Sequence, residues 1–150
     1  MKTLNLHSTD YGFSLIEVLV TLLILAIGLL SIAAMQLRGL QYNQDAYMRS
    51  QVNMLAYDIA DRMRLNRANL AAYVSNYTVP ATAPTGCTES NGANAANDLA
   101  CWYVQLYNGI PPGSTTSIAV NAGNPNMYDI TINWSDRENT PRSVQYTFQP

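Results

Sequence analysis

The sequence predicts an α+β protein in which one long N-terminal α-helix packs on a small antiparallel β-sheet. Three patterns lead to this fold class. The segment 18–35 (VLVTLLILAIGLLSIAAM) is apolar and carries no charge. A stripe of apolar residues at helical spacing follows it, between Met48 and Met63. Further along the chain, three short segments alternate apolar and polar residues with the period of two that is typical of a β-strand.

Length and composition restrict the classes of protein to consider. A chain of 150 residues can form one compact domain plus one extended element. Hydrophobic residues make up 48% of the chain and charged residues only 12%, which is about half of the charged share of soluble proteins. The net charge is −2, and Lys2 is the only lysine. Because binding to phosphates needs clustered Lys and Arg, no nucleic-acid partner is expected.

The first element is an apolar helix that begins near Phe13. Its charge-free part is at the short end of what spans a bilayer core of about 30 Å. Glu17 interrupts the apolar surface, and a carboxylate there is costly unless it is interfacial, protonated or paired. Glu17 is therefore either an interfacial or first-turn acid that complements the helix dipole, or a group that meets a positive charge on another chain.

Three fates are open to this N-terminal segment. It could be a secretory signal with Ser31-Ile32-Ala33 as the cleavage site, although the apolar run is long and Glu17 fits badly. It could also be an uncleaved single-pass anchor. The third possibility is cleavage ahead of the apolar run, after Gly12, which leaves Phe13 as the new N-terminus.

The residues around Gly12 favour the third possibility. The segment GFSLIEVLV at 12–20, preceded by the short polar leader MKTLNLHSTDYG at 1–12, resembles the class III signal of type IV prepilins. The resemblance implies that prepilin peptidase cleaves after Gly12 and that the same enzyme N-methylates Phe13. It also implies that Glu17 pairs with the N-terminal ammonium group of a neighbouring subunit, and that the leader lies in the cytoplasm.

The helical pattern continues beyond the apolar run. Asp45–Arg49 and Asp58–Arg62 are acid-before-base pairs four residues apart, which support an exposed helical face. A helix from about Phe13 to about residue 66 would be about 80 Å long. The pilin resemblance implies that its first part, 13–36, is a transmembrane and then filament-core helix, and that 37–67 is its amphipathic continuation. The predicted apolar stripe consists of Met48, Val52, Leu55, Ile59 and Met63.

A second resemblance concerns the end of this helix. The segment AYMRSQVNMLAYDIADRMRLNR at 46–67 resembles the minor pilins called type IV pilus modification protein PilV. Arg62, Arg64 and Arg67 within it could form an anion site. The stronger interpretation is that they complement the dipole at the helix C-terminus, beside Asp58 and Asp61.

Cys87 and Cys101 are the only cysteines. With His7 as the only histidine, they are too few for a zinc site. An even number of cysteines behind an export-type N-terminus favours one disulfide between them, which is worth about 3 kcal/mol in the chain-entropy model. Two unrelated buried thiols are the alternative.

The rest of the chain, 68–150, predicts a globular pilin domain. A loop over 79–94 precedes a short helix that Asn97-Asp98 caps, with Leu99, Trp102 and Leu106 on one face. The segment 110–113 (IPPG) ends this helix. Strands are expected over 117–121, 128–134 and 144–148. The ten tyrosines suggest either carbohydrate binding or, more simply, a half-buried surface.

The function implied by these resemblances is that of a minor pilin in the tip complex that primes type IV pilus assembly. The chain contains no catalytic constellation, so no enzyme, metal or cofactor is expected. The implied partners are other minor pilins, the major pilin, prepilin peptidase, the inner membrane and a tip adhesin. The C-terminal domain is expected in the periplasm before assembly and on the pilus surface after it. Two alternatives remain: a minor pseudopilin of a type II secretion system, and a membrane-anchored periplasmic binding module that does not assemble.

Overall fold

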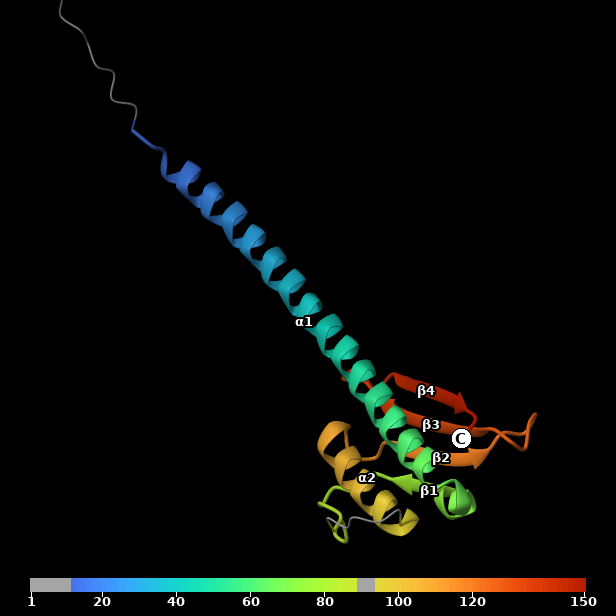
Figure 1. The fold of residues 1–150 in the computed structure, drawn as a ribbon. Coiled ribbons are helices and arrows are strands. Elements are labelled where there is room, and N and C mark those ends of the chain that lie inside the picture. Colours follow the sequence, from blue (N-terminus) through green and yellow to red (C-terminus); the bar gives the residue numbers. More distant parts are fainter. Residues whose placement is uncertain (1–11, 89–93) are drawn as a thin grey trace, which may run out of the picture. The chain divides into compact units, whose positions relative to one another are not determined.

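A computed structural model describes residues 12–88 and 94–150 (Figure 1). It confirms the predicted fold class of a long N-terminal helix with an antiparallel sheet. The chain divides into two compact units, Met1–Tyr42 and Asn43–Pro150. The elements are α1 (Leu15–Leu65), the 3₁₀-helix η1 (Arg67–Tyr73), β1 (Ser75–Thr78), α2 (Ala95–Gly109), β2 (Thr115–Val120), β3 (Tyr128–Ser135) and β4 (Pro141–Phe148).

Helix α1 begins and ends close to the predicted limits. Glu17 lies in its first turn and Arg62 and Arg64 lie in its last turn, where their charges complement the helix dipole. The helix ends where the backbone N–H of Asn66 donates to the carbonyls of Arg62 and Met63, both at 3.1 Å.

The predicted apolar stripe lies in the core of the second unit. Val52, Leu55, Ile59 and Met63 are buried, while Met48 is partly buried and packs against the same cluster. Ala56 and Ala60, which directly follow two residues of the stripe, are also buried, and their small side chains allow close packing.

The four strands form one antiparallel sheet in the order β1-β2-β3-β4. The three predicted strands correspond to β2, β3 and β4, whereas β1 was not predicted. Every second side chain of β3 is buried, as its alternating sequence predicts: Tyr128, Ile130, Ile132 and Trp134.

Helix α2 carries the predicted buried face of Leu99, Trp102 and Leu106. The prediction of its start was wrong, because Asn94 rather than Asn97-Asp98 is the N-cap. The Asn94 side chain accepts hydrogen bonds from the backbone N–H groups of Ala96 and Asn97.

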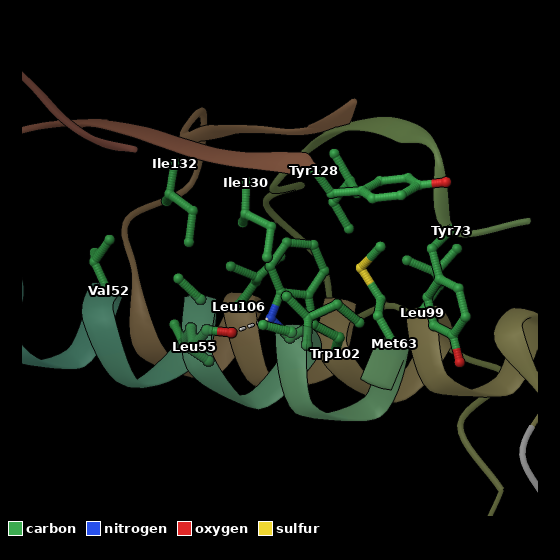
Figure 2. Close-up of a cluster of buried hydrophobic side chains, with 14 of the residues drawn as sticks. Val52, Leu55, Met63, Tyr73, Leu99, Trp102, Leu106, Tyr128, Ile130 and Ile132 are labelled. Carbon is green, nitrogen blue, oxygen red and sulfur yellow. Dashed lines mark hydrogen bonds between the residues drawn. The ribbon is translucent and has the colours of Figure 1, made fainter. Parts of the chain in front are cut away.

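Trp102 connects the two helices of the second unit. Its side chain is fully buried, and its indole Nε1–H donates to the carbonyl of Leu55 at 2.8 Å (Figure 2). Gly109 lies at the end of α2, where an added Cβ would approach the Leu55 side chain to 3.3 Å. The figure shows Ile130 and Ile132 of β3 facing the helices across this core, so sheet and helices share one hydrophobic cluster.

Candidate functional site: the N-terminus of α1 and the supports of the globular unit

The sequence-predicted processing and assembly residues occupy the first turn of α1 and the residues just before it. Gly12, Phe13 and Ser14 precede the helix. The Ser14 carbonyl accepts the backbone N–H of Glu17 at 3.0 Å and that of Val18 at 3.3 Å, which starts the helical hydrogen-bond ladder. Glu17 therefore sits at the positive end of the helix dipole. The predicted leader falls on residues 1–11, outside the described residues, except for Gly12.

The Glu17 carboxylate is solvent-exposed and forms no ion pair with any residue that the structure describes. Among the described residues, the favourable electrostatic interaction of this carboxylate is therefore the one with the positive end of the helix dipole. The arrangement leaves the carboxylate available for a cation from outside the chain.

The apolar half of α1 is exposed in the part of the chain that the structure describes. Its large side chains are exposed from Leu15, at 78%, to Leu40, at 64%, and Phe13 just before the helix is also exposed. By length and composition α1 is the one helix among the described residues that could cross a membrane, and none of its most apolar window is buried. A signal sequence near the N-terminus passes the same test, but a buried core helix would not look like this. Lipid or other apolar helices must cover a surface of this kind in water.

No contact among the described residues requires a glycine at position 12. A Cβ added at Gly12 would have nothing within 4 Å, and the same holds for Gly28 and Gly39 in α1. The chain's own packing therefore leaves the glycine at position 12 unexplained.

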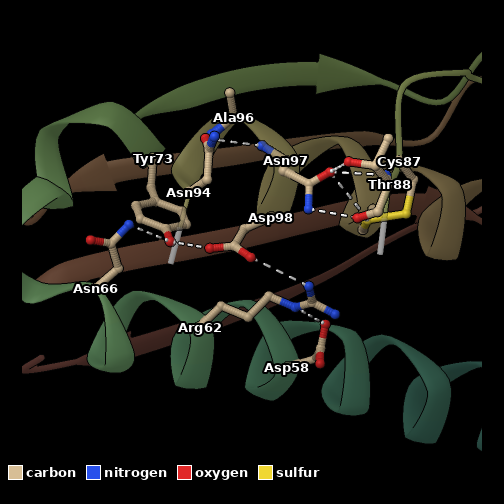
Figure 3. Close-up of polar contacts among 11 residues, drawn as sticks. Asp58, Arg62, Asn66, Tyr73, Cys87, Thr88, Asn94, Ala96, Asn97 and Asp98 are labelled. Atoms are coloured by element: carbon tan, nitrogen blue, oxygen red, sulfur yellow. Dashed lines mark hydrogen bonds and ion pairs between the residues drawn. A yellow bond between two sulfur atoms is a disulfide. The ribbon is translucent and has the colours of Figure 1, made fainter. Parts of the chain in front are cut away.

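Cys87 and Cys101 form a disulfide that joins the loop after β1 to α2. The side chain of Asn97, one turn before Cys101, binds the residue that follows Cys87 (Figure 3). Asn97 Oδ1 accepts from the backbone N–H and the hydroxyl of Thr88, both at 2.9 Å, and Asn97 Nδ2 donates to the Thr88 carbonyl at 2.8 Å. The sequence predicts the disulfide but not the amide contact.

The basic residues near the end of α1 are mostly neutralised within the chain. Arg62 pairs with Asp58 at 2.9 Å, as predicted, and with Asp98 of α2 at 3.6 Å. Arg64 pairs with Asp61 at 2.6 Å, and its guanidinium lies 5.1 Å from the centre of the Phe148 ring.

Arg67 and Arg49 lack such partners among the described residues. Arg67 forms no ion pair with a described residue, and the predicted Asp45–Arg49 pair does not form. Side chains one helical turn apart at the surface gain little free energy from pairing in water, so the Asp45–Arg49 pair can remain open. The engaged Arg62 and Arg64 favour the structural interpretation of these arginines over an anion site.

Tyr73 lies at the centre of a polar cluster that sequence reasoning missed. Its fully buried hydroxyl donates to the Asp98 carboxylate and accepts from Asn66 Nδ2 at 3.2 Å (Figure 3). Burial, and next the hydrogen bond to Asp98, raise the pKa of Tyr73 from 10.0 to about 12. No local pattern identifies this cluster, because Asp98 is far in sequence from its partners Arg62 and Tyr73.

Within residues 12–88 and 94–150 there is no group of three His, Cys, Asp or Glu side chains that could hold a metal ion. The charged groups that meet inside the globular unit form ion pairs and hydrogen bonds that join α1, η1 and α2. Their arrangement stabilises the fold.

Two family models match the chain. Residues 8–33 match the prokaryotic N-terminal methylation motif, and residues 34–105 match the Tt1218-like family, described as type IV pilin Tt1218. The first match contains Gly12, Phe13 and Glu17, and the second contains both cysteines. No curated protein and no solved structure matches the chain.

The fold, the exposed apolar helix and the two matches define a type IV pilin with a prepilin methylation motif. The chain is therefore a component of a pilus or a pseudopilus. Pilins are structural proteins, and the family is not known for enzymatic activity.

Proposed function

We propose that this chain is a minor pilin of a type IV pilus, which is processed after Gly12, methylated at Phe13 and inserted into the complex that primes assembly at the pilus tip. The observation that carries the proposal is the position of Glu17. It is a carboxylate without an ion pair to any described residue, in the first turn of α1 and four residues after Phe13, on the exposed apolar half of the helix.

The proposed role of Glu17 follows from the cost of burying a charge. In a bundle of apolar helices a lone carboxylate strongly disfavours every arrangement that leaves it unpaired. Cleavage after Gly12 would create an ammonium group on Phe13, which is the cation that a neighbouring Glu17 needs. Pairing between subunits would then select one axial register, while the apolar surface between Phe13 and Met35 supplies non-directional attraction.

The glycine at position 12 supports the proposed cleavage. The fold places no atom within 4 Å of a Cβ at Gly12, so packing does not require glycine there. A requirement imposed by another protein, the prepilin peptidase that must accommodate this backbone, accounts for the residue.

The segment 46–67 supports a pilus over a secretion filament, because it resembles minor pilins of the PilV type and lies inside the pilin match at 34–105. In this proposal the globular unit lies in the periplasm before assembly and on the pilus surface afterwards. Its neighbours are other minor pilins, the major pilin and a tip adhesin.

The test is a comparison of Glu17→Gln and Thr21→Val in a strain that lacks the chain. Glu17→Gln removes the charge and keeps the shape. Thr21→Val is the matched control, because Thr21 lies one turn further and its hydroxyl bonds only the Val18 carbonyl within the helix. Four quantities are measured: the chain in the inner membrane, the chain in sheared pili, pili per cell and secreted protein. Intact mass under non-reducing conditions reports processing.

We expect the unsubstituted protein and both variants to reach the membrane in similar amounts. The mass of each should be that of a chain that starts at methylated Phe13 and contains one disulfide. Glu17→Gln should lower incorporation and pili per cell by at least about tenfold, the factor that corresponds to 1.4 kcal/mol. Normal incorporation of Glu17→Gln would refute the register role of the charge. Loss of secretion with intact pili would identify a pseudopilin instead, and a chain that starts at Met1 would identify a plain membrane anchor.

A further inference from the structure

The disulfide of the globular unit is accompanied by a second, non-covalent connection between the same two segments. Asn97 of α2 binds Thr88 through three hydrogen bonds of 2.8–2.9 Å, and Thr88 directly follows Cys87 (Figure 3). Cys101 lies one turn after Asn97 on the same helix. The amide contact and the disulfide therefore join the loop to α2 at neighbouring points.

The amide contact fixes both the position and the direction of the loop. Asn97 binds the backbone N–H and the backbone C=O of a single residue, in the way that a neighbouring β-strand would. The helix that carries Asn97 is held by the core, since Leu99 and Trp102 are buried. A loop residue docked in this way on a fixed helix keeps little freedom to move.

From these contacts we propose that Asn97 is a positioning residue for the Cys87–Cys101 disulfide. It docks Thr88 on α2 before the sulfur atoms are joined, so that the Cys87 thiol is held beside the Cys101 thiol. It also keeps the loop in place when the disulfide is reduced. This inference goes beyond the proposed function and does not depend on it.

The physical basis is the entropy of closing the loop. The two cysteines are 14 residues apart in the sequence, and in the unfolded chain it is unfavourable to bring two points at this separation together. Three hydrogen bonds that form without the sulfur atoms offset part of that cost. In the reaction two thiols give up two protons and two electrons to a disulfide acceptor. Oxidised glutathione as acceptor is reduced to two molecules of glutathione while the protein disulfide forms.

The experiment measures this equilibrium for the full chain in detergent micelles, in buffers of defined reduced and oxidised glutathione. The variants are Asn97→Ala, which removes the three bonds to Thr88 together with the other contacts of the Asn97 side chain, and Thr88→Ala, which removes only the hydroxyl bond. Asn108→Ala is the matched control, since Asn108 is an exposed residue of α2 without a hydrogen bond from its side chain to a described residue. Alanine favours a helix more than asparagine does, so neither helix substitution weakens α2 by propensity.

We expect Asn97→Ala to lower the equilibrium constant for disulfide formation by about tenfold or more, because each hydrogen bond contributes a factor of several. Thr88→Ala should give a smaller decrease, and Asn108→Ala should match the unsubstituted protein. Equal constants for Asn97→Ala and Asn108→Ala would overturn the proposal.

A second measurement tests the docking without any sulfur chemistry. In the Cys87→Ser/Cys101→Ser protein, the Thr88 amide hydrogen should remain protected from exchange because it is donated to Asn97. Adding Asn97→Ala to this background should remove the protection, whereas adding Asn108→Ala should leave it. A Thr88 amide that exchanges freely in the double-serine protein with Asn97 intact would show that the amide contact depends on the disulfide, which contradicts the proposal.

Discussion

At the scale of single residues, the polar cluster around Tyr73 shows how a buried hydroxyl holds three elements together. Tyr73 ends η1, Asp98 belongs to α2 and Asn66 follows α1. Arg62 lies 3.6 Å from the Asp98 carboxylate, which keeps that partly buried acid paired. A partly buried carboxylate with an ion pair and a hydroxyl donor is less costly than one without partners.

The first prediction concerns Tyr73→Phe. The substitution keeps the ring in the core but removes the hydrogen bonds to Asp98 and Asn66, so the free energy of unfolding should fall by about 1–3 kcal/mol at neutral pH. Tyr107→Phe is the matched control, because Tyr107 packs against the same core without a hydrogen bond from its hydroxyl to a described residue. Chemical denaturation of both variants checks the difference, and equal stabilities would contradict it.

The same residue predicts a pH dependence. The folded protein holds the Tyr73 proton more tightly than the unfolded chain, since the pKa rises from 10.0 to about 12. Its contribution to stability is complete below the unfolded pKa and is lost as the pH rises through the folded one. Above pH 10, the free energy of unfolding of Tyr73→Phe should therefore fall less steeply with pH than that of the unsubstituted protein. An unchanged slope in Tyr73→Phe would assign the alkaline loss to other groups.

At the scale of elements, Asp136 organises the hairpin between β3 and β4. Its carboxylate accepts the backbone N–H groups of Glu138 at 3.0 Å and Thr140 at 2.8 Å and pairs with Arg142 at 3.0 Å. Asn139 adopts a φ of 56°, a left-handed conformation that asparagine tolerates better than most residues. Hydrogen bonds to the turn, first that from Thr140, lower the pKa of Asp136.

We therefore predict that Asp136→Ala opens this hairpin locally. The Thr140 amide should exchange with solvent at least about tenfold faster, since it loses its acceptor. Glu138→Ala, at an exposed side chain of the same turn, is the control and should leave the exchange unchanged. Because the Asp136 pKa is lowered, its support is present above its ordinary pKa and is lost as the pH falls through the folded one. Continued protection of Thr140 in Asp136→Ala would show that the strands alone hold the turn.

Elements with a local pattern were predictable from the sequence, and elements that depend on distant partners were not. Helix α1 and strands β2, β3 and β4 follow their hydrophobic periodicity. Strand β1 is the short segment SNYT, which becomes a strand through its pairing with β2. The predicted cap of α2 was wrong because both Asn94 and Asn97 precede the buried Leu99 and either could have capped the helix. The structure uses Asn94 as the cap and directs Asn97 to Thr88.

The candidate site divides in the same way. Gly12, Phe13 and Glu17 lie within one short motif, so their pattern can be read directly from the sequence. The Cys87–Cys101 pair could be inferred by counting, since the chain has no other cysteine. The contacts of Asp98 with Arg62 and Tyr73 join residues far apart in the chain, and only the packing of α2 beside α1 and η1 brings them together.

At the scale of the whole molecule, the apolar residues of α1 have two different environments. The stripe residues Val52, Leu55, Ile59 and Met63 are buried and belong to the core of the second unit. Those between Leu15 and Leu40 are exposed, as is Phe13 just before the helix. Folding of the single chain therefore uses one set, and the other set remains available for lipid or neighbouring helices.

This division predicts that the same substitution, leucine to alanine, has a large effect on stability at one position of the helix and a small effect at another. Leu55→Ala removes a side chain that is 9% exposed and packs beside Gly109 and Trp102. It should lower the free energy of unfolding by about 2–5 kcal/mol. Leu25→Ala removes a side chain that is 59% exposed, so it should change the free energy of unfolding by less than about 0.5 kcal/mol.

In the assembled fibre the order of the two effects should reverse. Leu25→Ala removes apolar surface that the filament is expected to bury, so the chain should enter sheared pili less efficiently while its folded unit stays intact. Leu55→Ala should enter pili in proportion to the fraction of the protein that is folded. Thermal denaturation in micelles and the amount in sheared pili measure both effects on the same two proteins. A large loss of stability in Leu25→Ala would mean that the exposed half of α1 contributes to folding, and the separation of folding from assembly along this helix would be wrong.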